Sequence, residues 1–151
     1  TTTSRMLSHV LKMAGFTVGT TSTDGVYIDG RLTVSGDMTG PTAAQIVLRD
    51  PSVDAAVMET ARGGLLRSGL GYRSSNVSAC LNIAADHLGL KGVETLADLA
   101  EVKRVVVEVA TDAAVLNADD PNCLNMADYC TAEKLCYVTM NRNHPLVREH
   151  I

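Results

Sequence analysis

Residues 57–72 read VMETARGGLLRSGLGY, and this stretch turns from apolar to charged within three positions. Residues 54–58, which include the first two residues of this stretch, are apolar enough for a buried strand. Charged residues and glycines then follow in close succession: Glu59, Arg62, Gly63, Gly64 and Arg67. Ligands of open parallel sheets collect beyond the carboxyl ends of the strands. The stretch therefore predicts a buried strand that ends at a ligand-binding turn.

Outward from this stretch, strand and helix patterns alternate along the chain. The β-branched or apolar segments that predict strands are 17–23, 26–28, 31–34, 54–59, 77–83, 113–117 and 135–140. Helical spacing or helix-start signals occur at 6–14, 41–48, 62–70, 95–110 and 121–129. This alternation predicts an α/β fold with a mostly parallel sheet flanked by helices, and Asp29-Gly30 predicts a small β-hairpin insertion. We expect one domain over residues 1–140, and a polar connector over 141–151.

The bulk composition excludes several classes of protein. The chain has 151 residues, of which 46% are hydrophobic, and a net charge of −4, which argues against nucleic acid as a partner. It shows no apolar run of membrane-spanning length and no signal-peptide pattern, so we expect neither a membrane protein nor an exported one. The cysteines form no C-x-x-C pair, so we expect reduced thiols in a cytoplasmic protein: Cys80, Cys123, Cys130 and Cys136.

Polar residues recur where the predicted strands end. They comprise Thr20–Asp24, Glu59, then Asn82, Asp86 and His87, and finally Asn117, Asp119 and Asp120. A polar residue at one strand end usually just begins a loop. Four such groups in succession favour a ligand site along one edge of the sheet.

Lys103 interrupts the apolar face of the helix predicted at 95–110. Leu99 and Val107 lie four positions to either side of it on the same face. An unpaired ammonium group is costly in a dry core. Two interpretations stay open: the side chain reaches the sheet edge with its charge in water, or it faces a carboxylate, phosphate or metal.

Three further residues have both a structural and a functional interpretation. His87 is a satisfied loop histidine, or it joins Glu59 and Lys103 in a cluster suited to Mg²⁺. Arg62 and Arg67 are solvated charges, or they bind a carboxylate or phosphate beside the Gly63-Gly64 turn.

Taken together, these motifs resemble the Mur-ligase-like, ATP-dependent amide ligases. The resemblance spans essentially the whole chain. It rests on the motifs Thr1–Arg5, Thr23–Gly30, Asp37–Pro41, Glu59–Arg67, Ala85–Leu90 and Asn117–Asp120. The Thr23–Gly30 and Glu59–Arg67 motifs resemble the branch of the family that adds arginine to a polyaspartate chain.

The resemblance implies the fold of a P-loop NTPase-like Mur ligase central domain and a set of site residues. Thr1 and Thr2 would follow the lysine of a G-x-x-G-K-T phosphate loop, and Thr1, Glu59 and His87 would bind Mg²⁺. Lys103 matches a lysine carried as a carbamate, and His87, Arg62 and Arg67 would share its catalytic region. Asn117 and Asp120 fall near the nucleotide, and Thr23, Asp24, Thr39 and Gly40 near the substrate. The loop's glycines and lysine are not in the sequence, so we expect residues 1–151 alone to be inactive.

The reaction implied by the resemblance is acyl activation with ATP and Mg²⁺. A carboxylate would be phosphorylated and an amine would then form the amide, with arginine and an aspartate-rich polymer as substrates and a homo-oligomer as the full-length enzyme. The alternatives are a folylpolyglutamate or muramyl-peptide ligase, and a nucleotide-binding module without catalysis. A generic NAD-binding domain is less favoured, because the sequence has no G-x-G-x-x-G motif.

Overall fold

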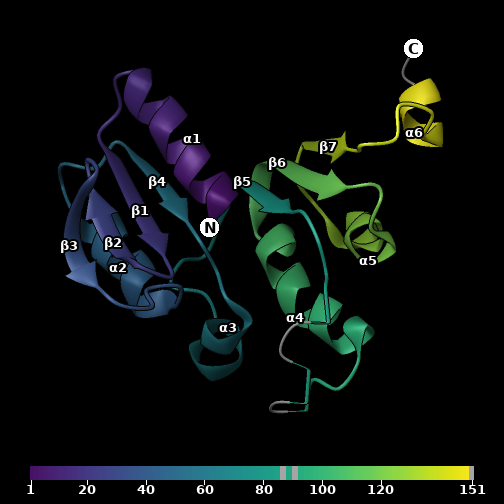
Figure 1. Cartoon of the computed structure of the whole chain (residues 1–151), viewed down its shortest axis with the longest axis horizontal. Coiled ribbons are helices and arrows are strands. Elements are labelled where there is room, and N and C mark those ends of the chain that lie inside the picture. Colours follow the sequence, from purple (N-terminus) through teal and green to yellow (C-terminus); the bar gives the residue numbers. More distant parts are fainter. Residues whose placement is uncertain (86–87, 90–91, 150–151) are drawn as a thin grey trace. The chain divides into compact units, whose positions relative to one another are not determined.

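The computed structural model describes residues 1–85, 88–89 and 92–149 and divides into two compact units. The first unit comprises Thr1–Tyr72, and the second begins at Arg73. In Figure 1 the first unit runs from purple to dark teal, and the second from teal to yellow. Each unit has its own sheet, described in turn below.

The first unit is built on a four-stranded sheet in the order β3-β2-β1-β4. Its strands are β1 (Val18–Ser22), β2 (Gly25–Ile28), β3 (Arg31–Ser35) and β4 (Ala55–Met58). β1 and β4 are parallel, whereas β2 pairs antiparallel with both β1 and β3. The hairpin predicted at Asp29-Gly30 is confirmed, with φ of 49° and 78° at its two turn residues.

Two helices cover the opposite faces of β1, which explains why this strand is buried along its whole length (Figure 1). The Thr20 hydroxyl lies 2.8 Å from the hydroxyl of Ser8 on α1 (Thr2–Met13). A Cβ at Gly19 would lie 2.4 Å from Val47 on α2 (Pro41–Arg49). Because successive strand residues point to opposite faces, α1 and α2 lie on different sides of the sheet.

Polar contacts, rather than buried side chains, hold α1 against the sheet. None of its residues is buried, and Met6, Val10 and Met13 are exposed. Arg5 forms an ion pair with Asp24, and Lys12 Nζ lies 3.0 Å from Asp29 Oδ1. Lys12 also donates to the Asp29 carbonyl at 2.7 Å. Thus both ion pairs join α1 to the two ends of β2.

The second unit contains a three-stranded parallel sheet in the order β5-β6-β7. The strands are β5 (Ser75–Cys80), β6 (Ala110–Asn117) and β7 (Lys134–Val138). α4 (Leu96–Glu108) precedes β6, while α5 (Pro121–Leu124) and a 3₁₀ helix (Asn125–Tyr129) separate β6 from β7. The Arg104 guanidinium on α4 lies 3.7 Å from the ring centre of Tyr129, which joins α4 to the 3₁₀ helix.

The ends of several elements differ from the predicted ranges. β5 ends at Cys80 instead of residue 83, and the backbone N–H of Ile83 bonds the side chain of Asp120 rather than a strand. The helix expected over 121–129 divides into α5 and the 3₁₀ helix. The tail contains a four-residue helix, α6 (Pro145–Arg148).

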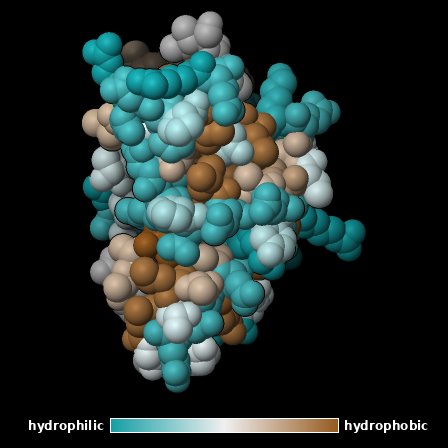
Figure 2. Space-filling model, turned by 90° about the vertical axis from the view of Figure 1, so that its right-hand side faces the viewer, coloured by the Kyte–Doolittle hydropathy of each residue, from teal (hydrophilic) through white to brown (hydrophobic). Residues whose placement is uncertain are grey.

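Apolar side chains also reach the surface. Figure 2 shows brown apolar patches bordered by teal polar residues on one side of the molecule. The exposed hydrophobic residues of the second unit include Val77, Leu135, Val138 and Met140. Among the described residues, no helix combines the length and the apolar character needed to cross a membrane.

Candidate functional site

Glu59 follows directly after β4, and hydrogen bonds to β1 fix its backbone. The Glu59 N–H donates to the hydroxyl of Thr21 at 3.0 Å, and that hydroxyl lies 3.4 Å from the Glu59 carbonyl oxygen. Thr21 is buried and belongs to β1, the parallel neighbour of β4. The side chain of Glu59 is therefore presented from a rigid sheet edge, as the sequence predicts.

Three side chains of the predicted site come together at this edge. The Thr1 hydroxyl, directly before α1, donates to Glu59 Oε1 at 2.8 Å and lies 3.4 Å from the hydroxyl of Thr23. Glu59 Oε2 is buried and has no hydrogen-bond partner. A buried carboxylate oxygen without a partner is costly unless a ligand or cation satisfies it.

The donor set at this edge fits Mg²⁺. It consists of one carboxylate and two hydroxyl groups, which are the hard oxygen ligands that Mg²⁺ prefers. Mg²⁺ usually keeps several waters and takes only one or two protein ligands, so few protein donors are needed. Among the described residues, no cluster of three histidine, cysteine or acidic side chains could hold a metal by itself.

Thr2 and Asp24 also lie near this edge of the first unit. Thr2 begins α1 and is exposed. Asp24 follows β1 and forms the ion pair with Arg5, so its carboxylate contributes to fastening α1. Its role in substrate binding stays a prediction.

Backbone contacts join two of the predicted motifs of the first unit, Asp37–Pro41 and Glu59–Arg67. The Ala61 N–H donates to the Thr39 carbonyl at 3.1 Å, which links the turn after Glu59 to the segment before α2. A Cβ at Gly64 on α3 (Arg62–Ser68) would lie 2.9 Å from the Cα of Gly40. Only glycines permit this close approach of α3 to the start of α2.

An open groove runs between the start of α2 and α3. Its volume accessible to the centre of a water molecule is about 250 Å³, and its lining includes Asp37, Gly40, Gly64 and Arg67. Arg67 Nε donates to the Gly63 carbonyl at 2.9 Å, which leaves the terminal nitrogens of the guanidinium group for other partners. Arg62, the first residue of α3, is half-buried. The two predicted arginines therefore lie on one short helix.

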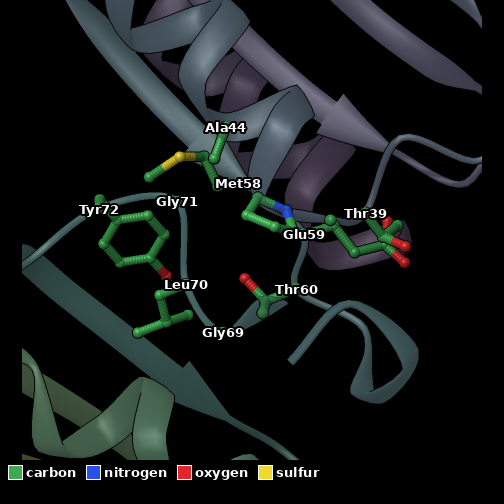
Figure 3. Close-up of a pocket in the computed structure, with 11 residues that line it drawn as sticks. Thr39, Ala44, Met58, Glu59, Thr60, Gly69, Leu70, Gly71 and Tyr72 are labelled. Atoms are coloured by element: carbon green, nitrogen blue, oxygen red, sulfur yellow. The ribbon is translucent and has the colours of Figure 1, made fainter. Parts of the chain in front are cut away.

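A smaller hollow lies between α2 and the segment that leads out of α3. Its lining includes Thr39, Met58, Glu59, Thr60 and Tyr72. Figure 3 shows the Glu59 side chain extending away from Tyr72, and the Tyr72 hydroxyl pointing to the side of Thr60. Burial raises the pKa of Tyr72, and a hydrogen bond with the Thr60 side chain partly offsets this rise. No sequence pattern indicates this pair, because neither residue interrupts a periodic pattern.

In the second unit, Asn117 and Asp120 hold two loops together. Asn117 Nδ2 donates to the Leu81 carbonyl at 2.9 Å, and Asp120 Oδ2 accepts from the Ile83 N–H at 2.6 Å. Asp120 Oδ1 also accepts from Asn122 and Cys123 at the start of α5. Both residues lie at the carboxyl edge of the parallel sheet, as predicted. Their nucleotide contacts stay a prediction.

Lys103 lies on α4 and is half-buried. Its charge helps to lower the pKa of Cys80 at the end of β5, so the ammonium group is near the carboxyl end of that strand. Among the described residues, no carboxylate lies within ion-pair distance of Lys103. His87 lies outside the described residues, and Glu59 and Lys103 belong to different units. The convergence of these three groups therefore stays a prediction.

Similarity to known proteins places this chain in a known class. The family model of the Mur ligase middle domain matches residues 1–149, and the chain belongs to this family. A solved structure of UDP-N-acetylmuramoyl-L-alanyl-D-glutamate–2,6-diaminopimelate ligase has a TM-score of 0.76 over 93% of this chain and 30% of its own. At 21% identity, this likeness shows the α/β Mur ligase fold.

More similar relatives carry one particular name. The chain is 53% identical over 153 residues to cyanophycin synthetase of Trichormus variabilis (strain ATCC 29413 / PCC 7937). It is 49% identical over 153 residues to cyanophycin synthetase of Synechocystis sp. (strain ATCC 27184 / PCC 6803 / Kazusa). Both alignments cover 100% of this chain and 17% of the relative, so the chain spans about one sixth of their length.

Proposed function

We propose that this chain is the ATP-binding central domain of a cytoplasmic ATP-dependent amide ligase that makes cyanophycin. The reaction would add arginine to the side-chain carboxylates of a polyaspartate chain. Membership of the Mur ligase middle domain family supports the ligase chemistry. The identity of about half the residues to cyanophycin synthetases supports the particular substrates.

One observation carries the proposal: the arrangement of Glu59, Thr1 and Thr23. Glu59 directly follows β4, Thr1 directly precedes α1, and the two side chains meet at 2.8 Å with the second carboxylate oxygen unpaired. Thr1, Glu59 and Thr23 would hold Mg²⁺ with the phosphates of ATP, and His87 would complete the set. When bound, Mg²⁺ would neutralise charge on the phosphate oxygens.

The groove between α2 and α3 supports a site for the acceptor chain. An open groove of about 250 Å³ suits part of an extended polymer better than an enclosed small molecule. The Arg67 guanidinium would bind a carboxylate of that polymer, while Arg62, three positions from Glu59, would orient the carboxylate that reacts. Thr39 and Gly40 would fix the position of this groove relative to Glu59 through the Ala61 and Gly64 contacts.

The chemistry is a two-step acyl transfer. The aspartate side-chain carboxylate would take the terminal phosphoryl group of ATP to give an acyl phosphate and ADP. The amino group of arginine would then attack the acyl carbon, lose a proton and release phosphate, which leaves an amide. Positive side chains stabilise the charge that develops on phosphoryl and acyl oxygens during such steps. Arg62 and Arg67 would supply these positive charges, whereas Lys103, carried as a carbamate, would supply an anion that faces the metal.

The test uses the full-length enzyme with Glu59→Gln, and Glu133→Gln as the matched control. Glu133 is exposed, and its side chain is not part of the site. We expect Glu59→Gln to raise the half-saturating Mg²⁺ concentration by about 10–100-fold in an assay of ATP turnover with arginine and an aspartate-rich primer, and Glu133→Gln to leave it unchanged. Equal Mg²⁺ dependence in both variants would contradict the metal site. Turnover that is independent of arginine would contradict arginine as the substrate but would leave the proposed ligase chemistry in place.

A further inference from the structure

Two buried thiols lie in contact at the carboxyl edge of the second sheet. Cys80 is the last residue of β5, and Cys123 lies in the first turn of α5. Cys80 is 9% exposed and Cys123 is fully buried, and their sulfur atoms are 3.7 Å apart. All four cysteines of the chain are free thiols. The ligase chemistry proposed above uses neither Cys80 nor Cys123.

The geometry of the pair permits a covalent link. A disulfide bond requires a sulfur separation of about 2.05 Å, so the two sulfur atoms would approach by about 1.7 Å. The two residues are 43 positions apart in the chain, but hydrogen bonds already join the segment after β5 to the segment before α5, through Ile83 with Asp120 and Leu81 with Asn117.

The environment shifts the pKa values of the two thiols in opposite directions. The hydrogen bond that the Cys123 thiol donates lowers the pKa of Cys80, and the positive charge of Lys103 adds to this effect. The same hydrogen bond, together with burial, raises the pKa of Cys123. The negative charge of Asp120 opposes ionisation of both thiols. Cys80, the more exposed of the two, is therefore the one that ionises first.

We propose that Cys80 and Cys123 form a reversible thiol–disulfide switch that controls the turn between β6 and α5. The Cys80 thiolate attacks a low-molecular-weight disulfide such as glutathione disulfide, forms a mixed disulfide and releases one thiolate. The Cys123 thiol then loses its proton and attacks the Cys80 sulfur, which releases the second thiolate. The protein loses two electrons and two protons in total, and two molecules of the small thiol are produced.

The effect of this disulfide on the neighbouring loops follows from the hydrogen bonds around the pair. Asp120 caps the turn that contains Cys123 and also holds the Ile83 N–H, while Asn117 holds the Leu81 carbonyl. A bond from Cys80 to Cys123 pulls this turn toward β5 and fixes both loops. If Asn117 and Asp120 lie near the nucleotide, as the resemblance to Mur ligases implies, the oxidised enzyme binds ATP more weakly; this consequence rests on the proposed function.

The first experiment identifies the bond in the full-length enzyme. The protein is equilibrated with glutathione buffers of increasing disulfide content, free thiols are blocked, and peptides are mapped without reduction. We expect a cross-linked peptide pair containing Cys80 and Cys123 that disappears with dithiothreitol. The matched control is Cys136→Ser, which removes an exposed thiol and leaves the cross-link unchanged. Failure to find the pair in buffers that convert Cys136 to its mixed disulfide would overturn the proposal.

The second experiment measures whether the bond changes the turn. We expect the amides of residues 117–124 to exchange hydrogen several-fold more slowly in the oxidised enzyme, and Cys80→Ser to abolish this difference. Equal exchange in the reduced and oxidised forms would show that the bond is no switch. ATP titration of the same samples separates the two proposals. No ATP binding by the reduced enzyme would contradict the proposed function, whereas the exchange result still decides the switch.

Discussion

Gly64 approaches Gly40 so closely that a single methyl group at position 64 would lie 2.9 Å from the Cα of Gly40. It would also lie 3.3 Å from the Thr39 carbonyl oxygen. Both neighbours are backbone atoms, which cannot rotate away as a side chain can. This contact sets the distance between the helix that carries Arg67 and the start of α2.

Gly64→Ala should therefore weaken the attachment of α3. We expect the local free energy of opening, measured by hydrogen exchange at residues 62–68 in the full-length protein, to fall by about 1–3 kcal/mol because of overpacking. Gly63→Ala is the matched control, since its Cβ would meet only the flexible end of Arg67 at 3.4 Å. The control should be neutral or stabilising by up to about 1 kcal/mol, because alanine favours a helix. Equal effects of the two changes would contradict the close contact.

Asp120→Asn should distinguish the two roles of the Asp120 carboxylate, which caps α5 and accepts from the Ile83 N–H. The variant keeps an oxygen to cap α5, but its amide nitrogen cannot accept from the Ile83 N–H. We expect the opening free energy of residues 81–83 to fall by about 1–3 kcal/mol, with little change in α5. Asp120→Ala should additionally cost about 1 kcal/mol in α5 through loss of the cap. Asp128→Ala, at an exposed position, is the control and should change neither region.

Tyr72 should make the first unit sensitive to alkaline pH. Burial raises the pKa of Tyr72 in the folded protein, so the unfolded chain loses this proton at a lower pH than the folded one. Stability from the neutral phenol is therefore fully present below about pH 10 and is lost as the pH rises toward the folded pKa. The difference in phenolate absorbance between wild type and Tyr72→Phe should show a raised midpoint. Thr60→Val should raise it further, because the Thr60 hydrogen bond lowers this pKa; a lower midpoint would contradict the contact.

Lys103 should influence the reactivity of Cys80. Its positive charge lowers the pKa of Cys80, but less than the hydrogen bond from Cys123 does. We expect Lys103→Met to shift the alkylation profile of Cys80 to higher pH, and Cys123→Ala to shift it further. The measurement is the rate of alkylation at Cys80 by peptide mapping across pH. Lys134→Met, on β7, is the control, because it removes the same charge. If it shifted the alkylation profile of Cys80 as far as Lys103→Met does, the effect of Lys103 would not be local.

The sequence predicted the elements better than their ends, for physical reasons visible at particular residues. Asp29-Gly30 was decisive because both turn residues need a positive φ, and the structure has φ of 49° and 78° there. The strand predicted to reach residue 83 stops at Cys80, and the N–H of Ile83 bonds instead to Asp120, 37 positions away. Long-range side-chain bonds of this kind leave no local pattern.

The candidate site was predictable to a similar degree. Glu59 and Thr23 could be assigned to one edge because each stands at the end of a predicted strand, whereas Thr1 was assigned only through the family resemblance; the structure joins all three. The hydroxyl of Tyr72 and the contact of Cys80 with Cys123 could not be predicted, because both depend on packing between distant segments. The convergence of Lys103 and His87 with Glu59 stays a prediction.

The attachment of α1 makes the Thr1 hydroxyl responsive to ionic strength. A helix held by an Arg5–Asp24 pair and a Lys12–Asp29 pair, with no buried side chain, has little apolar packing to keep it in place when electrolytes weaken those pairs. Concentrated salt should therefore loosen this helix, and with it the preceding Thr1 that meets Glu59, while leaving the sheet beneath it intact. Buffer composition thus becomes a practical means of separating damage to this edge from loss of the fold.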